Sequence, residues 1–506
     1  MIALDGDTLT LDGLVAVADH FEPVTVDDKA AARVNASRAV VEKKAAGDEP
    51  VYGINTGFGA LAETTVPADA LNLLQLNLLR SHAAGVGEPL PVRAVRASMA
   101  LRANVLAKGF SGIRLSTLER FVEMLNRRVH PVVPSRGSVG ASGDLAPLAH
   151  LALVLVGEGL ATIGDHHEIL PGASALERAG LAPVSLAVKE GLALINGTQP
   201  STAIAALTVV EAERLARTAD IAAALSIDAL RGSVRPFDER IHAARPHPGQ
   251  STAASNIRRL LEGSAINKSH EGCGRVQDAY SLRCAAQVHG AARDALQFVR
   301  ERLTTEANGA TDNPMVFASD DEIVSGGNFH GAPVAVAADV LTIALAQFAT
   351  ISERRSDRLV NPVLSDLPAF LTPNSGLHSG YMMAQVTAAA LVSEIKTLAH
   401  PASVDTIPTS ANREDHVSMS MGAALKAARA LELAARVVAI EMLCACQAID
   451  LLAPLMTSRP LHRVHAAVRA HVPPLQGDRP PSPDIERIVE LIRDGTLEFA
   501  SGEEVK

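Results

Sequence analysis

The residues of this chain that could do chemistry are gathered in short, polar, glycine-rich segments between long apolar stretches. The segments are YGINTGFG (52–59), SHAAGVG (81–87), GSVGASGD (137–144), INGTQ (195–199), RVQDAYSLR (275–283), SGGNFH (325–330) and TSANREDHVSM (409–419). The chain has only three tyrosines, and Tyr52 and Tyr280 both lie in these segments. Taken singly, each is best explained as an amphipathic residue at the edge of a core. Together they indicate that the phenol protons take part in chemistry.

The segment GSVGASGDLAP, residues 137–147, is first of all typical of a helix start. Ser142 or Asp144 can serve as N-cap, and Pro147 is tolerated in the first turn before an apolar run. The segment lacks the Gly-Lys-Ser/Thr of a phosphate-binding loop and the glycine spacing of a dinucleotide-binding fingerprint. It is not a nucleophile elbow either, because Asp144 and not glycine stands two residues after Ser142.

Backbone chemistry is a third interpretation of Ala141-Ser142-Gly143. Because glycine has no side chain, the amide nitrogen of Gly143 can approach the carbonyl carbon of Ala141 in a sharply bent loop. Ring closure with loss of water, together with dehydration of Ser142, would leave an exocyclic methylene group. That group is a strong electrophile, which no ordinary side chain supplies.

The longer segment GSVGASGDLAPLAH resembles the signature of the aromatic amino acid ammonia-lyase family. The resemblance extends through all the polar segments in the same order, and KEGLALINGTQ, QDAYSLRC and EDHVSM are most similar to the histidine-specific members. It implies a carbon–nitrogen lyase that converts L-histidine to trans-urocanate and ammonium, the opening step of histidine degradation. It also implies a prosthetic group, 4-methylidene-imidazol-5-one, formed autocatalytically from Ala141, Ser142 and Gly143, with no dissociable cofactor and no metal.

The resemblance assigns roles to the other residues of these segments. Tyr52 resembles the loop tyrosine of the family that takes the β-proton of the substrate, with Glu414 and Tyr280 as alternative bases. Arg283 would clamp the substrate carboxylate, because its planar fork matches two oxygens at once. The prosthetic group and the amine or carboxylate of the substrate would be held by Asn196, Gln277 and Tyr280.

Selectivity for the substrate ring would depend on Glu414 and His82. Glu414 can accept an imidazole N–H, whereas a phenyl ring would leave this carboxylate buried and unpaired. A plainer interpretation makes Glu414 a favourable charge at a helix N-terminus, since SANREDHVSM is typical of a helix start. Phe329 and His330 would line the site or support ring formation, with packing as the alternative.

Two residues depart from the family pattern. Arg413 stands where histidine-specific members commonly have glutamine, and a cation there could change the pKa of Glu414 or draw it away. Ala279 stands where some members have proline.

Two further functions stay open. One is the same chemistry on tyrosine or phenylalanine, including an aminomutase reaction, and the other is an inactive helical scaffold.

Composition predicts a globular, cytoplasmic protein. The chain has 506 residues, of which 47% are hydrophobic, and a net charge of −10 without a long basic cluster. This argues against nucleic-acid and membrane partners and favours a small amino acid substrate. The N-terminus lacks the pattern of a secretory signal, and prolines and polar residues interrupt the uncharged stretch 367–393. We interpret Cys273, Cys284, Cys444 and Cys446 as reduced core residues, and His166 and His167 as a solvated turn rather than metal ligands.

Apolar spacing predicts a mainly α-helical fold with a long central helix bundle. In 334–351 one apolar stripe repeats at intervals of three and four, formed by Val334, Ala338, Leu341, Leu345 and Phe348. Similar helices are expected over 201–230, 275–303, 380–400 and 416–453, with antiparallel neighbours. The first part is more mixed, with strands at 24–26 and a hairpin near Gly164.

We therefore divide the chain into a mixed region, residues 1–200, that carries the prosthetic group, and residues 201–506, the long-helix bundle with a C-terminal helical region. The family resemblance implies the ammonia-lyase/fumarase-like superfold and a homotetramer whose active sites are shared between subunits.

Overall fold

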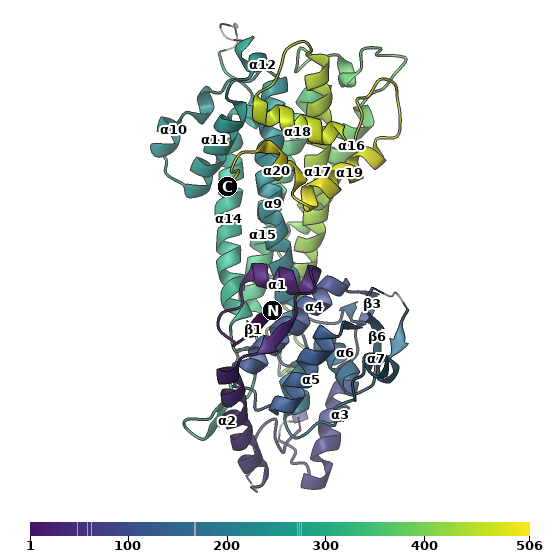
Figure 1. The fold of residues 1–506 in the computed structure, drawn as a ribbon. Coiled ribbons are helices and arrows are strands. Elements are labelled where there is room, and N and C mark those ends of the chain that lie inside the picture. Colours follow the sequence, from purple (N-terminus) through teal and green to yellow (C-terminus); the bar gives the residue numbers. More distant parts are fainter. Residues whose placement is uncertain are drawn as a thin grey trace. The chain divides into compact units, whose positions relative to one another are not determined.

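The structure is a computed structural model that describes residues 1–47, 49–57, 59–61, 63–165, 168–270, 272, 274 and 276–506. The chain is mainly α-helical, as its sequence predicts (Figure 1). Its residues form two compact units: unit 1 comprises Met1–Leu207, Arg300–Asp339 and Pro401–Leu425, and unit 2 comprises Thr208–Val299, Val340–His400 and Lys426–Lys506. The division at residue 200 does not anticipate that two later segments group with unit 1.

The elements of unit 1 are mostly short. Its helices are α1 (Leu11–Asp19), α2 (Asp28–Ala45), α3 (Leu71–His82), α4 (Val92–Ala107), α5 (Leu115–Asn126), α6 (Leu145–Leu155), α7 (Gly172–Arg178) and α8 (Glu190–Ile195), with 3-10 turns η1 (Gly59–Leu61), η2 (Ala68–Ala70) and η5 (Ser410–Asn412). Its strands are β1 (Ile2–Leu4), β2 (Val24–Val26), β3 (Val86–Pro89), β4 (Val129–Pro131), β5 (Pro134–Arg136), β6 (Leu160–Ile163), β7 (Leu170–Pro171), β8 (Met315–Phe317) and β9 (Glu322–Val324).

Long helices dominate the rest of the chain. Four of them contribute residues to both units: α9 (Gln199–Ala229), α14 (Ala285–Ala307), α15 (Ala332–Val360) and α17 (Ser420–Leu451). Unit 2 also contains η3 (Arg235–Phe237), α10 (Glu239–Ala243), α11 (Pro248–Leu261), α12 (Ala265–Lys268), α13 (Tyr280–Arg283), η4 (Ala369–Leu371), α16 (Met382–Leu398), α18 (Arg459–Arg469), α19 (Ser482–Arg493) and α20 (Thr496–Ser501).

The small sheets of unit 1 confirm the predicted strands. Strand β2 is the predicted 24–26 segment and pairs in parallel with β1, with Ile2 opposite Val24. Strands β6 and β7 form the predicted antiparallel hairpin, with Ala161 opposite Leu170. His166 and His167, between these strands, lie outside the described residues.

Helix α4 is the core helix of unit 1, because every residue from Ala94 to Ala107 is buried. Its polar side chains therefore have to find partners inside the protein. Arg96 donates to the carbonyl oxygens of Val17 in α1 and Leu125 in α5, at 2.8 and 3.1 Å. Asn104 accepts from the amide of Gly6 at 2.9 Å. Helix α4 thus joins the N-terminal elements by hydrogen bonds as well as by apolar contact.

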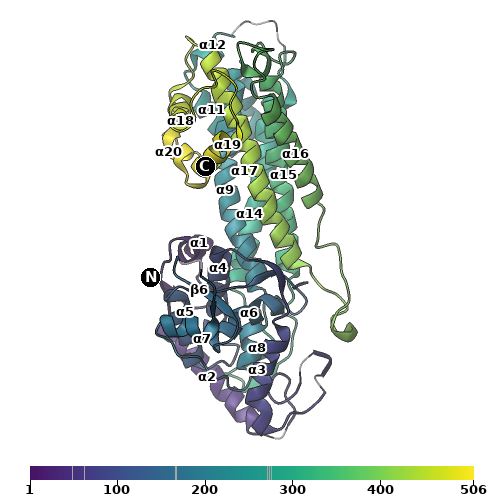
Figure 2. The same cartoon turned by 90° about the vertical axis from the view of Figure 1, so that its right-hand side faces the viewer.

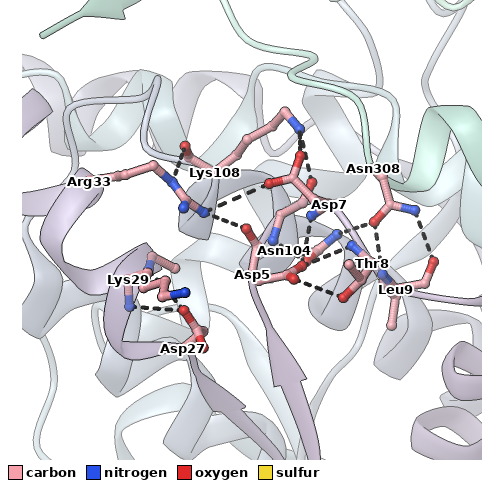
Figure 3. Close-up of polar contacts among 12 residues, drawn as sticks. Asp5, Asp7, Thr8, Leu9, Asp27, Lys29, Arg33, Asn104, Lys108 and Asn308 are labelled. Atoms are coloured by element: carbon pink, nitrogen blue, oxygen red, sulfur yellow. Dashed lines mark hydrogen bonds and ion pairs between the residues drawn. The ribbon is translucent and has the colours of Figure 1, made fainter. Parts of the chain in front are cut away.

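The N-terminal turn after β1 is held by hydrogen bonds to α2 and to the residue that follows α14 (Figure 3). The carboxylate of Asp5 accepts from the amide and hydroxyl of Thr8 at 2.9 and 2.8 Å, while Arg33 of α2 donates to the Asp5 carbonyl at 2.6 Å. Asn308, just after α14, exchanges two hydrogen bonds with the backbone of Leu9. The first residues of the chain are therefore part of the fold of unit 1.

Within unit 2 the long helices lie side by side, as Figures 1 and 2 both show. Arg293 of α14 bonds to the Ala216 carbonyl and to Asp220 of α9, and His289 bonds to Asp220, so α9 and α14 are antiparallel as predicted. Helices α15 and α17 instead run in the same direction, because Ser352 meets Val437 and Arg355 meets Glu441. The reason is that α16 reverses the chain between them.

The predicted helix over 275–303 starts too early. Residues 276–279 precede the four-residue α13, and the long helix α14 begins only at Ala285. The Asp278 carboxylate accepts from the amide of Ser233 at 2.7 Å, a contact between two distant segments that fixes this stretch outside the helix. The apolar spacing alone did not indicate this break.

Buried thiols and an apolar helix follow the sequence interpretation. Cys444 and Cys446 are buried, free thiols on α17, and burial raises the pKa of Cys446 to about 12. Cys284 is free and half-buried, and Cys273 lies outside the described residues.

Across the described ranges no group of three or more His, Cys, Asp or Glu side chains could hold a metal ion. Helix α15 alone among the described helices is long and apolar enough to cross a membrane, but 67% of that apolar window is buried inside the protein.

A buried ion pair joins α15 to α17 in unit 2. Arg355 and Glu441 are both fully buried and approach within 2.5 Å, and the hydroxyl of Ser226 donates to Glu441 at 2.6 Å. The ring of His289, whose pKa burial lowers, donates to Asp220 and faces the Arg355 guanidinium with its other nitrogen at 3.4 Å. Charges at the centre of unit 2 are thus paired across its helices.

We expect Glu441→Leu to lower the free energy of unfolding by about 3–5 kcal/mol, because it leaves the Arg355 charge buried and unpaired. The double variant Arg355→Met with Glu441→Leu should recover most of this loss. Urea unfolding at one fixed protein concentration measures both. A single variant as stable as the double variant would contradict the prediction.

Candidate active site

The Ala141-Ser142-Gly143 triplet forms a tight turn before α6. Asp144 occupies the N-cap position of α6, as one sequence interpretation predicts, but its side chain caps no amide of that helix. Instead the buried Asp144 carboxylate accepts from the Ser138 hydroxyl at 2.6 Å and from the Ser201 amide of α9 at 2.8 Å. Burial raises the pKa of Asp144. The acid of this motif therefore ties the turn to α9.

The glycines of the turn are required by close backbone contacts. Gly143 has a φ of +70°, and a Cβ there would lie 2.2 Å from the carbonyl oxygen of Gly197. The same oxygen accepts the amide of Asp144 at 2.7 Å. Gly140 has a φ of +67°, and a Cβ there would lie 2.2 Å from the hydroxyl oxygen of Ser418. The turn is pressed between two other polar segments.

The segment before α17 holds the other side of the turn. Ser418 donates its hydroxyl proton to the Gly140 carbonyl at 2.8 Å, and the amide of Met419 donates to Val139 at 2.7 Å. The amide of Gly331 also donates to the Gly140 carbonyl, at 3.2 Å. Three segments that are far apart in the sequence therefore converge on the triplet.

Glu414 lies against Ser142 of the triplet. Its carboxylate accepts from the Ser142 hydroxyl at 3.0 Å and from the Thr409 hydroxyl at 2.5 Å. Helix α17 begins only at Ser420, so the interpretation of Glu414 as a helix N-terminal charge is wrong. The guanidinium of Arg413 turns to Glu63 at 3.1 Å, away from the carboxylate that we expected it to disturb.

His82 of unit 1 interacts electrostatically with Glu414. It is the last residue of α3, it is half-buried, and its Nδ1 lies 2.9 Å from the Leu78 carbonyl, which places the ring proton on Nδ1. Burial lowers the pKa of His82, while the Leu78 carbonyl and the negative charge of Glu414 oppose that shift. The ring is therefore neutral near pH 7 and within electrostatic reach of Glu414.

Asn196, Phe329 and Tyr52 are also in unit 1. Asn196 ends α8 beside Gly197, and its buried Oδ1 has no hydrogen-bond partner within the described residues. Phe329 is half-buried, and the next residue, His330, stacks on His416 with ring centres 5.8 Å apart. The hydroxyl of Tyr52 accepts a long hydrogen bond from the Gly59 amide at 3.5 Å.

The loop that carries Tyr52 contacts the segment that carries Glu414. A Cβ at Gly59 would lie 3.1 Å from the Ser410 hydroxyl, and Glu63 pairs with Arg413. The unusual arginine is thus explained as a link between these two segments.

Gln277, Tyr280 and Arg283 form a separate group in unit 2. The guanidinium of Arg283 lies 4.6 Å above the ring of Tyr280, which is 70% exposed. Gln277 and Arg283 line a pocket of about 840 Å³ that also contains Arg231 and Arg235. This positively charged pocket suits an anionic group, and its nearby phenol is open to a partner.

The family of the chain can now be decided. Residues 9–470 match the family model described as aromatic amino acid lyase. The chain belongs to the aromatic amino acid lyase family.

Relatives of this lyase are similar over their full length. The histidine ammonia-lyase of Gloeobacter violaceus is 56% identical over 98% of this chain and 96% of that protein. The crystal structure of histidine ammonia-lyase from Trypanosoma cruzi has a TM-score of 0.92 and 47% identity, and covers 99% of this chain and 95% of that chain. Tyrosine aminomutase from Streptomyces globisporus has a TM-score of 0.93 at 40% identity, covering 99% of this chain and 98% of that one.

Two contacts of the lyase were not foreseen from its sequence. Thr409 holds one oxygen of Glu414, and Arg102 of α4 donates to the Asn196 carbonyl at 2.7 Å. Thr409 lies in the same polar segment as Glu414, which is a weak signal. Arg102 stands out only as a charge within the run ALRANVLA, because nothing in the sequence indicates what it bonds.

We expect Gly140→Ala to destabilise the lyase by about 1–3 kcal/mol beyond backbone strain, because its Cβ collides with Ser418. Gly164→Ala is the matched control: its φ is +60°, but a Cβ there meets nothing within 4 Å. Both substitutions share the cost of a left-handed residue, so the difference between their melting temperatures isolates the collision. Equal losses would show that position 140 has room for a side chain.

Proposed function

We propose that the protein is a histidine ammonia-lyase, which deaminates L-histidine without oxidation to trans-urocanate and ammonium, as the first step of histidine degradation. The observation that carries the proposal is the meeting of the Ala141-Ser142-Gly143 turn with the carboxylate of Glu414. The 56% identity to a histidine ammonia-lyase, against 40% to a tyrosine aminomutase, supports histidine as the substrate.

The residues around the triplet fit 4-methylidene-imidazol-5-one as the prosthetic group. Gly143 packs so closely on Gly197 that a side chain is excluded, and Ala141 is buried, so the backbone is already bent and shielded. The unpartnered Oδ1 of Asn196 is available to accept a hydrogen bond from the substrate. When present, the group supplies an electrophilic carbon that makes the substrate amine a better leaving group.

Glu414 and His82 select the ring of the substrate. Dehydration of Ser142 removes the hydroxyl that Glu414 binds in the uncyclised chain, so this oxygen becomes available for an imidazole N–H. Thr409 keeps the other oxygen in place. A phenyl ring would leave the first oxygen without a donor, at a cost of about 1–3 kcal/mol. The neutral His82 completes the polar surroundings of an imidazole. Phe329 supplies an apolar wall.

Proton removal and carboxylate binding are assigned to the other segments. Tyr52 takes the β-proton of the substrate, and the link from its loop to the Glu414 segment supports closure over the site. Arg283 clamps the substrate carboxylate through its planar fork, with Gln277 and Tyr280 beside it.

We further propose a cytoplasmic homotetramer in which each active site takes residues from more than one subunit. The exposure of Tyr280 supports this, because a residue that acts on the substrate has to be covered. Apolar side chains on α15 and α16 are also exposed, namely Val336, Ile343, Met383 and Val386. The acidic net charge supports a small-molecule substrate rather than nucleic acid or membrane.

Intact mass and product absorbance test this function directly. We expect the purified chain to be lighter than its sequence by two water molecules and to form urocanate from L-histidine. Turnover of tyrosine or phenylalanine to coumarate or cinnamate, or to a β-amino acid, without turnover of histidine would favour the rival substrates. An unmodified mass would favour an inactive scaffold.

We expect Tyr52→Phe to lower kcat by about 10²–10⁴-fold while the mass remains short of two waters, because only the base is removed. Tyr381→Phe is the matched control, since that buried hydroxyl has no hydrogen-bond partner within the described residues and lies in no polar segment. Its kcat should equal that of the wild type. Near-normal turnover of Tyr52→Phe would move the role of base to Tyr280 or Glu414.

A further inference from the structure

Arg102 is a fully buried arginine in the middle of α4 that the proposed mechanism does not use. Its Nη1 donates to the carbonyl of Asn196 at 2.7 Å and to the side chain of Gln199 at 2.8 Å, and its Nη2 donates to the carbonyl of Ala193. These partners are the C-terminal end of α8 and the first residue of α9. One side chain therefore binds the connection between α8 and α9, residues 193–199.

The charge of Arg102 is stabilised by hydrogen bonds to backbone carbonyls and by the negative charge of Asp312. Burial lowers its pKa to about 10, so the guanidinium is still charged near neutral pH. The Asp312 carboxylate is 4.0 Å away and lies nearer to Lys189, at 3.7 Å. The C-terminal carbonyls of α8 carry partial negative charge and supply the remaining attraction. A buried guanidinium held in this way resists any movement of those carbonyls.

The connection between α8 and α9 that Arg102 binds also packs against the triplet. A Cβ at Gly197 would lie 2.5 Å from Nη1 of Arg102, so the arginine packs directly on this residue. The carbonyl of Gly197 in turn accepts the Asp144 amide at 2.7 Å and sits against Gly143. Arg102 therefore contacts Gly197, and Gly197 contacts Gly143, whose nitrogen would close the ring.

We propose that Arg102 is a positioning residue for the autocatalytic ring closure at Ser142. It keeps the carbonyls of Ala193 and Asn196 in place. Gly197 then holds the backbone bend that brings the Gly143 nitrogen to the Ala141 carbonyl carbon. This inference rests on the proposed function, because it assumes that the triplet cyclises.

The chemistry that Arg102 would favour is balanced without an oxidant. A bond forms between the Gly143 nitrogen and the Ala141 carbonyl carbon. The Ala141 oxygen leaves as water with the amide protons of Ser142 and Gly143, and Ser142 loses its hydroxyl and α-proton as a second water. Arg102 donates nothing to these atoms, so its effect is on geometry alone.

Arg96 is a matched control on the same helix. It is 1% exposed, burial lowers its pKa to about 10, and it also donates to backbone carbonyls, those of Val17 and Leu125. Its partners are Val17 in α1 and Leu125 in α5, neither of which lies in a polar segment around the triplet. The two arginines share near-complete burial and hydrogen bonds to backbone carbonyls. Arg102 also bonds the Gln199 side chain, whereas Arg96 stacks on the ring of Phe21 at 4.5 Å.

The experiment compares Arg102→Met and Arg102→Lys with Arg96→Met and Arg96→Lys in the full chain. Melting temperature measures stability, and intact mass measures the fraction of chains that lack two waters. We expect the two methionine variants to lose similar stability, but the matured fraction to fall at least tenfold only in Arg102→Met. Arg102→Lys should mature partially, because an ammonium replaces the charge but not the planar fork.

Each outcome decides the proposal. Equal maturation of the Arg102 and Arg96 variants overturns it, and so does a matured fraction that merely follows the melting temperature across all four variants. If Arg102→Met is insoluble, the lysine pair gives the same comparison. A wild-type chain that has lost no water contradicts the proposed function itself, which keeps the two failures distinct.

Discussion

The approach of the backbone at Gly143 to the carbonyl of Gly197 is the constraint on which the candidate site depends. At this contact neither residue has space for a side chain, and the Gly197 carbonyl is already used by the Asp144 amide. Such crowding is unfavourable unless surrounding groups hold both chains in place. Asp144 and Ser418 hold the triplet, and Arg102 holds the other side. Unit 1 is organised to keep this bend.

Both compact units bury charged side chains in pairs or groups. Unit 1 buries Arg102, Lys189 and Asp312 together, and unit 2 buries Arg355 against Glu441. An ion pair of this kind contributes little net stability compared with apolar packing, but it tolerates few alternative arrangements. Helices linked in this way give the short polar segments fixed end points.

Arg413, which departs from the family pattern, has a different partner in the structure from the one that its place in the sequence suggests. Beside Glu414 in the sequence, a cation would be expected to compete for the carboxylate. In the structure Arg413 pairs with Glu63, and the Glu414 oxygens are taken by the hydroxyls of Ser142 and Thr409. Neutral donors orient the carboxylate without cancelling its charge.

The sequence by itself indicated the long helices, although not the break before α14, as well as the strands near 24–26 and Gly164 and the triplet that we propose to cyclise. These follow from local spacing, from backbone preferences and from the chemistry of three adjacent residues, and none of them requires a distant partner. Only the tertiary structure decided that Arg102 supports Gly197, that Thr409 orients Glu414, and that α15 and α17 run in the same direction. These depend on which segments meet after folding, and residues almost a hundred positions apart, such as Arg102 and Asn196, carry no local signal of their contact. Gln277, Tyr280 and Arg283 belong to the second compact unit for the same reason, because chain folding and not spacing assigned them there.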